Sequence, residues 1–291
     1  MLYKKILVLY FSGTGNTCFV AKRLCHHFQM QGSDVEYVPI EDFLYDRRNI
    51  DYSSYDLIGL GFPVHAMDAP KIVYDFLAKM PGGRFSYFLF KTAGDPLFDG
   101  GSFSYVMREM GKLGGKCVGN SLFIMPPNVG FNRSNEAIKD LCLIADRQAE
   151  RVALQILTAK LSSQLDKCFY PLLKVFSHLE AHGARFFSNR WKISLACIHC
   201  GKCIKLCPQR NIAGSGKQIQ FGKSCILCLR CVFNCSVHAI GCYSLVNKLI
   251  AKPYNLDSIF TDSRLRGGYF KNSNTGLDHR YRIWFLQNDL I

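Results

Sequence analysis

The first 160 residues alternate between continuous apolar runs and segments whose apolar positions recur at helical spacing. The runs have the length and composition of strands buried on both faces; they cover residues 5–11, 34–40, 56–62, 84–91 and 116–125. The longest segment with helical spacing covers residues 134–159. Strands that alternate with helices predict an α/β fold, a doubly wound parallel sheet of five strands covered on both faces.

A loop of glycine, hydroxyl and amide residues, SGTGNT at Ser12–Thr17, follows the first predicted strand. In a doubly wound sheet, ligands bind outside the carboxyl ends of the strands. The glycines allow close backbone approach, and the hydroxyls and the first N–H groups of the next helix are donors for a phosphate monoester. The loop lacks the Gly-Lys-Ser/Thr ending of a P-loop and the third glycine of the dinucleotide fingerprint. The alternative is a plain turn capped by Asn16 or Thr17.

Two further loops belong to the same edge of the sheet, because they follow the third and fourth predicted strands. They cover Gly61–Pro70 and Thr92–Gly101 and are rich in glycine and proline. A flat apolar ring fits between them, with Phe62, His65 or Met67 against one face. Ordinary loop packing is the alternative for each of these three side chains.

Two twelve-residue runs carry eight of the fourteen cysteines: CIHCGKCIKLCP from Cys197 and CILCLRCVFNCS from Cys225. The cysteine spacing is identical, and the 28-residue offset continues in apolar pairs such as Ile212/Ile240. This is the spacing of bacterial ferredoxins, in which the fourth cysteine of a run ligates the other four-iron cluster. We therefore expect two [4Fe-4S] clusters. The expected metal ligands are Cys197, Cys200, Cys203 and Cys235 in one cluster, and Cys225, Cys228, Cys231 and Cys207 in the other.

Structural zinc is the alternative for these runs, with four cysteines in each tetrahedral site. Zinc ribbons use two C-x2-C pairs that lie further apart, so they do not need three cysteines on one short turn. Pro208 follows the first run, whereas Ser236 stands at the matching place of the second. We expect this to loosen the second turn without loss of a cluster. The six remaining cysteines are scattered in apolar company and are interpreted as packing residues.

The loop YFSGTGNT resembles the phosphate loop of flavodoxins, and the chain as a whole resembles the flavodoxin–ferredoxin fusion proteins of anaerobic bacteria and archaea. The resemblance covers about residues 3–243 and includes a PVHA loop, a KTAG loop and the MPPN segment at Met125–Asn128. It implies FMN as a cofactor. The phosphate contacts that it implies are Ser12, Gly13, Thr14, Gly15, Asn16 and Thr17. The flavin-ring contacts that it implies are Pro63, Val64, His65, Ala66, Thr92, Ala93, Gly94 and Asp95.

These expectations divide the chain into four parts. Residues 1–160 form a flavodoxin-like FMN-binding domain, and residues 193–243 form a small α+β dicluster ferredoxin domain. The basic, aromatic-rich segment 161–192 is expected to pack between them, and a peripheral contact with a membrane surface is its alternative. The extension 244–291 is polar and turn-rich, and one hypothesis is that it folds back over the ferredoxin domain.

Charge and hydropathy limit the partners. The formal net charge is +14, and two oxidised clusters with their thiolates would lower it to about +10. Because the basic residues are spread along the chain, we expect no nucleic acid as a partner and an acidic redox protein instead. No apolar run has the length of a transmembrane segment. The N-terminal apolar run is interpreted as a buried strand, not a signal peptide, so a cytoplasmic location is expected.

The expected function is electron transfer between two [4Fe-4S] clusters, FMN and an external redox partner. The alternative is an FMN-dependent reductase of a small substrate, with the clusters as electron input. That enzyme needs a proton donor near the flavin, and His65 and Asp95 are the candidates. No catalytic residue is assigned, because no nucleophile–base pair and no second phosphate loop for a nicotinamide cofactor is present in the sequence.

Overall fold

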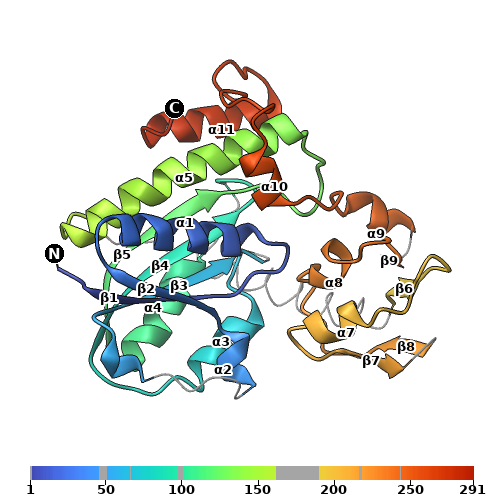
Figure 1. Cartoon of the computed structure of the whole chain (residues 1–291), viewed down its shortest axis with the longest axis horizontal. Helices are drawn as coiled ribbons and strands as arrows, with labels where there is room; N and C mark the ends of the chain where they lie inside the picture. The colour runs from blue at the N-terminus through green and yellow to red at the C-terminus, as the bar shows by residue number, and fades with distance from the viewer. Residues whose placement is uncertain are drawn as a thin grey trace.

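In the computed structural model, the described residues are 2–45, 51–65, 67–97, 101–161, 190–215, 218–242 and 244–291. The predicted ring contact Ala66 and most of the predicted interdomain segment, residues 162–189, lie outside them. Figure 1 shows an α/β part (residues 2–161), a cysteine-rich part (residues 190–242) beside it, and a C-terminal extension (residues 244–291). None of the described helices is both long enough and apolar enough to cross a membrane.

Five strands form the sheet of the α/β part, in the order β2-β1-β3-β4-β5. All neighbouring strands are parallel. The bounds are Lys5–Tyr10 (β1), Asp34–Pro39 (β2), Leu57–Pro63 (β3), Phe85–Ala93 (β4) and Gly115–Ile124 (β5). This strand order is that of flavodoxin-like doubly wound sheets, so the predicted fold class is confirmed for this part.

Helices cover both faces of the sheet, because successive strand residues point to opposite sides. Ile6 and Val8 of β1 belong to the core under α1 and α5, whereas Leu7 and Leu9 belong to the core under α3 and α4. The helix bounds are Asn16–Met30 (α1), Glu41–Leu44 (α2), Lys71–Leu77 (α3), Ser102–Lys112 (α4) and Asn135–Leu157 (α5), and a 3-10 turn covers Tyr52–Ser54. The loop after β1 faces the cysteine-rich part (Figure 1).

The described residues of the cysteine-rich part form two short helices and two antiparallel strand pairs. The helices are α7 (Lys202–Leu206) and α8 (Arg230–Phe233). One strand pair joins β6 (Lys192–Ile193) to β9 (Ile240–Gly241), and the other joins β7 (Ile212–Ser215) to β8 (Gln218–Phe221).

A shift of 28 residues relates the backbone of the two halves of this part. The pair Ile193↔Ile240 corresponds to Phe221↔Ile212, and both are registered in the same way. Left-handed backbone conformations also recur at this offset. They occur at His199 and Leu227, at Gly201 and Leu229, and at Arg210 and His238, with φ between 48° and 68°. The internal repeat predicted from the two runs is therefore present in the fold.

The C-terminal extension packs mainly on the α/β part, contrary to the hypothesis that it covers the cysteine-rich part. It contains α9 (Ser244–Leu249), α10 (Leu256–Thr261) and α11 (Gly276–Gln287). Phe270, Tyr281 and Phe285 form a buried cluster with residues of α5 and β5, and Figure 1 shows α11 running along α5. The beginning of the extension also contacts the cysteine-rich part: Asn247 Oδ1 accepts from the Cys242 N–H at 2.7 Å, and the Tyr254 ring packs against Phe233 of α8 at 5.3 Å between ring centroids. The apolar positions of α11 explain this, since they meet an apolar face of α5.

Candidate functional site

The loop Ser12–Thr17 joins β1 to α1 at the carboxyl edge of the sheet. Gly15 has a left-handed backbone with φ 106°, a conformation that favours glycine. Helix α1 begins at Asn16, and no side chain caps its first turn by a hydrogen bond. Asn16 and Thr17 lie inside the helix and their side chains contact Pro126 and Thr92, so neither of them is the N-cap residue. The first N–H groups of α1 are available as donors to an anion.

The polar side chains of this loop differ in their partners. Ser12 Oγ is buried and lacks a hydrogen-bond partner within the described part of the chain. In contrast, Thr14 Oγ1 donates to Asn128 Oδ1 at 2.9 Å, and Asn16 Nδ2 donates to the Pro126 carbonyl at 2.9 Å. A buried polar group left unpaired costs about 1–3 kcal/mol. A phosphate oxygen that accepts from Ser12 would remove this cost, so the loop fits the phosphate of FMN.

Tyr254 of the C-terminal extension contacts the residues around Asn16 and Asn128 beside the phosphate loop. The sequence analysis did not find this residue. Its hydroxyl donates to Asn128 Oδ1 at 2.7 Å and lies 3.1 Å from both Asn16 Oδ1 and the Pro126 carbonyl oxygen. Burial raises the pKa of Tyr254 above its ordinary value, so the hydroxyl stays protonated and a donor. Nothing in the surrounding KPYNLD sequence distinguishes this tyrosine from a packing residue.

The two loops expected at the flavin ring are held by protein contacts. His65 is enclosed by Phe11, at 6.5 Å between ring centroids, and by the backbone of Ile226, and burial lowers the pKa of His65 to about 4. Thr92 Oγ1 lies 2.8 Å from Thr17 Oγ1, which ties the third loop to the phosphate loop. Asp95 forms an ion pair with Arg280 of α11 at 3.0 Å.

The sequence placed Pro63–His65 and Thr92–Asp95 at one edge, and the structure does so. Both segments follow directly from the carboxyl ends of β3 and β4. Neither lines the cleft beside the phosphate loop described below. Contact with a flavin ring stays a prediction for these residues.

The cysteine sulfurs accept backbone hydrogen bonds in a pattern that repeats at the 28-residue offset. His199 N–H donates to Cys197 Sγ and Leu227 N–H to Cys225 Sγ, both at 3.4 Å. Asn211 N–H donates to Cys207 Sγ and Ala239 N–H to Cys235 Sγ, both at 3.3 Å. Donors aimed at sulfur stabilise the thiolate form that ligates metal.

Cys207 lies with the three leading cysteines of the second run, as crossed ligation requires. The side chains of Cys207, Cys225, Cys228 and Cys231 line one pocket together with Trp191 and Phe221. Burial, and then the neighbouring thiols of Cys228, Cys225 and Cys207, raise the pKa of Cys231. This grouping fits the donor set of one cluster. Among the first-run thiols, Cys197 and Cys200 lie close enough to raise the pKa of Cys203, although burial is the larger cause.

In the described part of the chain, no three His, Cys, Asp or Glu side chains converge on a point where a single metal ion could bind. A tetrahedral zinc site needs sulfurs about 2.3 Å from one point. A four-iron cluster spreads its thiolates over four separate irons. The ligand sets of the two clusters therefore stay a prediction, and the zinc alternative stays open.

Arg230 joins the cysteine-rich part to the phosphate loop. Its Nε and Nη2 donate to the Ser12 carbonyl oxygen at 3.1 and 2.6 Å, and its guanidinium forms an ion pair with the buried carboxylate of Glu41. Burial raises the pKa of Cys228 to about 12, and the positive charge of the Arg230 guanidinium offsets part of this rise. The only sequence signal for Arg230 is its place in the second run, where the first run has Lys202.

The backbones of the two parts also touch at Gly13. A Cβ atom on Gly13 would lie 2.2 Å from the carbonyl oxygen of Cys228, so only glycine permits this approach. The second cysteine run therefore lies directly against the predicted phosphate loop.

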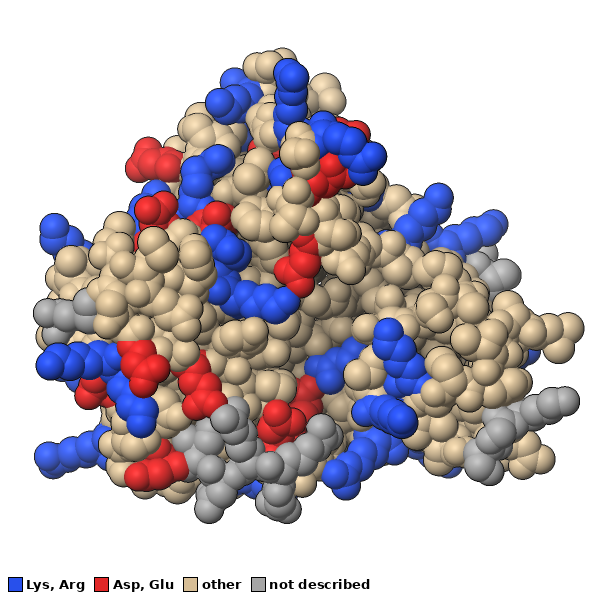
Figure 2. Space-filling view, in the orientation of Figure 1, with Lys and Arg blue, Asp and Glu red and all other residues tan. Residues whose placement is uncertain are grey.

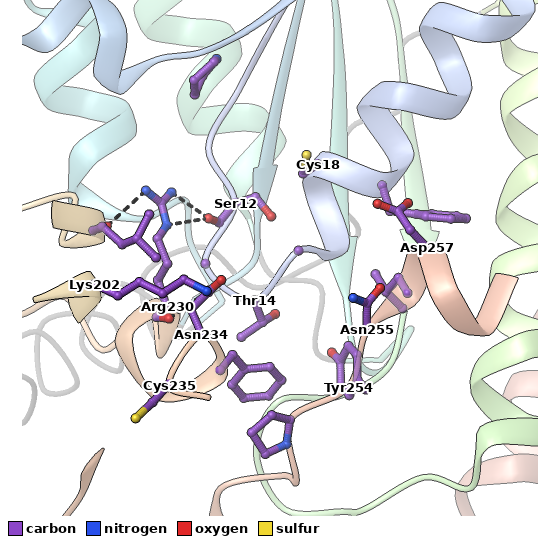
Figure 3. Close-up of a pocket in the computed structure, with 18 of the residues that line it drawn as sticks. Ser12, Thr14, Cys18, Lys202, Arg230, Asn234, Cys235, Tyr254, Asn255 and Asp257 are labelled. Carbon is purple, nitrogen blue, oxygen red and sulfur yellow. Dashed lines mark hydrogen bonds between the residues drawn. The ribbon is translucent and has the colours of Figure 1, made fainter. Parts of the chain in front are cut away.

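A cleft of ≈ 720 Å³ lies next to the phosphate loop, between the α/β part and the cysteine-rich part (Figure 3). Its wall comes from three parts of the chain: the phosphate loop with the start of α1, the helices α7 and α8 with the turn after α8, and residues 253–257 of the C-terminal extension. Figure 2 shows both basic and acidic side chains around the hollow between the parts. The cations of the cleft are Lys22, Lys202 and Arg230, and its carboxylate is Asp257. Its volume suits a small ligand or a protruding protein loop.

Comparisons with known proteins found solved structures that are similar to part of the chain. No protein-family model matches the sequence, and no curated protein matches it. Among solved structures, a flavodoxin from the domain Archaea is 15% identical with a TM-score of 0.36, over 53% of this chain and 99% of the other. The two-electron reduced Megasphaera elsdenii flavodoxin is 24% identical with a TM-score of 0.35, over 51% and 98%. A structure described as a flavone reductase is 12% identical with a TM-score of 0.40, over 58% and 69%.

Proposed function

We propose that this chain is an electron-transfer protein that holds FMN at Ser12–Thr17 and two [4Fe-4S] clusters at its two cysteine runs. The contact between the phosphate loop and the second run carries the proposal. Gly13 touches the Cys228 backbone, and Arg230 binds the Ser12 carbonyl. Redox groups that exchange electrons within one chain must lie close together, and this contact supports such a position for the FMN and one cluster.

FMN takes two electrons and releases them singly, and four-iron clusters carry one electron at a time. The residues of the chain supply binding and orientation. Ser12 and the first N–H groups of α1 hold the phosphate. Cys225, Cys228, Cys231 and Cys207 hold the cluster nearer to the FMN, and Cys197, Cys200, Cys203 and Cys235 hold the outer one. Arg230 fixes the distance between the second run and the phosphate loop.

The reductase alternative is less well supported by the arrangement of its acid candidates. His65 is partly buried and its pKa is lowered to about 4, so at neutral pH its ring is neutral and it is not an imidazolium acid. Asp95 is paired with Arg280. Neither side chain lines the cleft. We therefore propose a carrier and not a dedicated substrate-converting enzyme.

The test is stopped-flow reduction of the anaerobically purified protein by two donors, at low and high ionic strength. A chemically reduced acidic ferredoxin should reduce the flavin quickly, and the rate should fall as salt rises, because opposite charges steer the two proteins together. NADH and NADPH should reduce it slowly, since no nicotinamide site is predicted. Fast, salt-independent reduction by a nicotinamide cofactor alone would favour the reductase instead.

A further inference from the structure

The repeat of the cysteine-rich part creates two related faces, of which the α/β part covers one. We call residues 208–210 and 226–230 the inner face. Arg230 binds Ser12 and Glu41, and Arg210 lies over the Tyr45 ring at 3.8 Å. Tyr45 also donates a hydrogen bond to the Pro208 carbonyl. The inner face thus binds a surface of the α/β part that offers apolar side chains, a carboxylate and a backbone carbonyl.

The matching outer face lies 28 residues away in each half, at residues 198–202 and 236–238. Ile198 corresponds to Ile226, which packs against the core of the α/β part, yet Ile198 is 62% exposed. Lys202 corresponds to Arg230 and makes no ion pair with any described residue. Lys202, Ser236 and His238 line the open cleft. The outer face therefore offers the same types of group to solvent that the inner face offers to the α/β part.

The outer face also contains the exposed end of the first cysteine run. Cys200 is exposed, whereas its counterpart Cys228 is only partly exposed and touches Gly13. Leu195, just before the run, is 107% exposed. Exposed apolar side chains grouped near a binding residue mark protein contacts more often than isolated ones do.

Charge decides which protein fits. The inner face meets a carboxylate, Glu41, through Arg230. Lys202 is the cation at the equivalent place of the outer face, where it lines the open cleft. A second copy of this chain is strongly basic, with a formal charge of +14, so two copies repel each other. An acidic protein is attracted.

We propose that the outer face is the docking site for a separate acidic electron-carrier protein. A carboxylate of this partner would pair with Lys202, and an apolar pocket of the partner would receive Ile198. The proposal rests on the proposed function, because it gives the outer cluster an external partner. The chain's own α/β part provides the template for the contact. Electrons would enter or leave at the first cysteine run, and the second run would connect it to the flavin.

The test measures binding alone, by biolayer interferometry on the anaerobically purified full-length protein. The probes are a purified acidic flavodoxin and a purified acidic ferredoxin. The variants are Ile198→Asp and Lys202→Glu. The matched controls are Leu154→Asp, 40% exposed on α5, and Lys116→Glu, exposed at the start of β5. All four positions are solvent-exposed, so iron content and thermal unfolding should stay unchanged.

At least one probe should bind. Ile198→Asp should weaken its affinity about tenfold or more, and Lys202→Glu should slow association about tenfold at low salt and little at high salt. The controls should bind like the parent protein. Binding by neither probe, or equal losses in variants and controls, would overturn the docking site. A protein that lacks iron and flavin but still binds through Ile198 would instead overturn the proposed function, so the two failures are distinct.

Discussion

The guanidinium of Arg230 donates two hydrogen bonds to the backbone carbonyl of Ser12, from Nε at 3.1 Å and from Nη2 at 2.6 Å. The two residues lie 218 positions apart in the sequence. The ion pair with Glu41 is part of the same contact, and the Glu41 side chain is only 5% exposed. One arginine thus connects the second cysteine run, the phosphate loop and α2.

Replacing this arginine should loosen the contact between the two parts. Arg230→Ala leaves the Glu41 carboxylate buried without its cation, and breaking a buried pair costs about 3–5 kcal/mol. Urea unfolding should show a loss of this order. Arg264→Ala is the control, because Arg264 pairs with Asp262 on the surface with its side chain 88% exposed, and exposed pairs contribute about 0–1 kcal/mol.

The double variant Arg230→Met with Glu41→Gln separates the two causes. It removes both charges, so it should recover part of the stability lost in Arg230→Ala. Similar small losses at positions 230 and 264 would show that the contact does not hold the parts together.

The close approach at Gly13 gives a second prediction. Gly13→Ala places a Cβ 2.2 Å from the Cys228 carbonyl oxygen, so either the loop or the second run must shift. Weaker FMN binding, measured by flavin fluorescence, should accompany a change in the spectrum of the nearer cluster. Gly111→Ala on α4 is the control, because its Cβ meets no atom within 4 Å, and alanine in a helix interior is more stable than glycine by about 0.5–1 kcal/mol.

Crossed ligation predicts which cluster depends on Cys207. Cys207→Ser should damage the cluster of Cys225, Cys228 and Cys231, because all four line the same pocket. Electron paramagnetic resonance of the reduced protein should show the loss of one cluster signal, the one that Cys225→Ser also removes. Cys117→Ser on β5, outside both runs, should leave both signals intact. Loss of the signal that Cys200→Ser removes would contradict the crossed arrangement.

His65 predicts a dependence of stability on pH. Its pKa is about 4 in the folded protein, against 6.5 ordinarily, because burial disfavours the charged form. Between these values the unfolded state binds more protons, so stability is full above pH about 6.5 and falls by about 1.4 kcal/mol per unit as the pH drops toward 4. His65→Gln should flatten this part of the profile, and His26→Gln, at an exposed position, should not. If stability depended on pH in the same way in the parent protein and in His65→Gln, the lowered pKa of His65 would be contradicted.

The sequence predicted the parts of this structure that depend on local patterns. Continuous apolar runs gave the five strands, since both faces of a parallel sheet are buried. The 28-residue offset of the cysteines anticipated the repeat in backbone conformation at His199 and Leu227. The SGTGNT loop was correctly placed at the end of β1.

The contacts between parts could not be predicted, because they join residues far apart in the chain. Arg230 and Glu41 are separated by 189 positions. Glu41 belongs to no motif, and the place of Arg230 in the second cysteine run does not indicate that it pairs with Glu41. Tyr254 reaches Asn16 across 238 positions. The course of the C-terminal extension depends on an apolar cluster of Phe270, Tyr281 and Phe285 against α5, and a turn-rich sequence does not specify which surface receives it.

The central claim is that one chain carries FMN and two four-iron clusters, and cofactor content tests it most directly. Iron, acid-labile sulfide and flavin should be quantified on the same anaerobically purified sample. The account predicts about eight irons, about eight sulfides and one FMN per chain. Zinc in place of iron would contradict the clusters, and FAD or no flavin in a sample that is replete in iron would contradict the phosphate site at Ser12–Thr17.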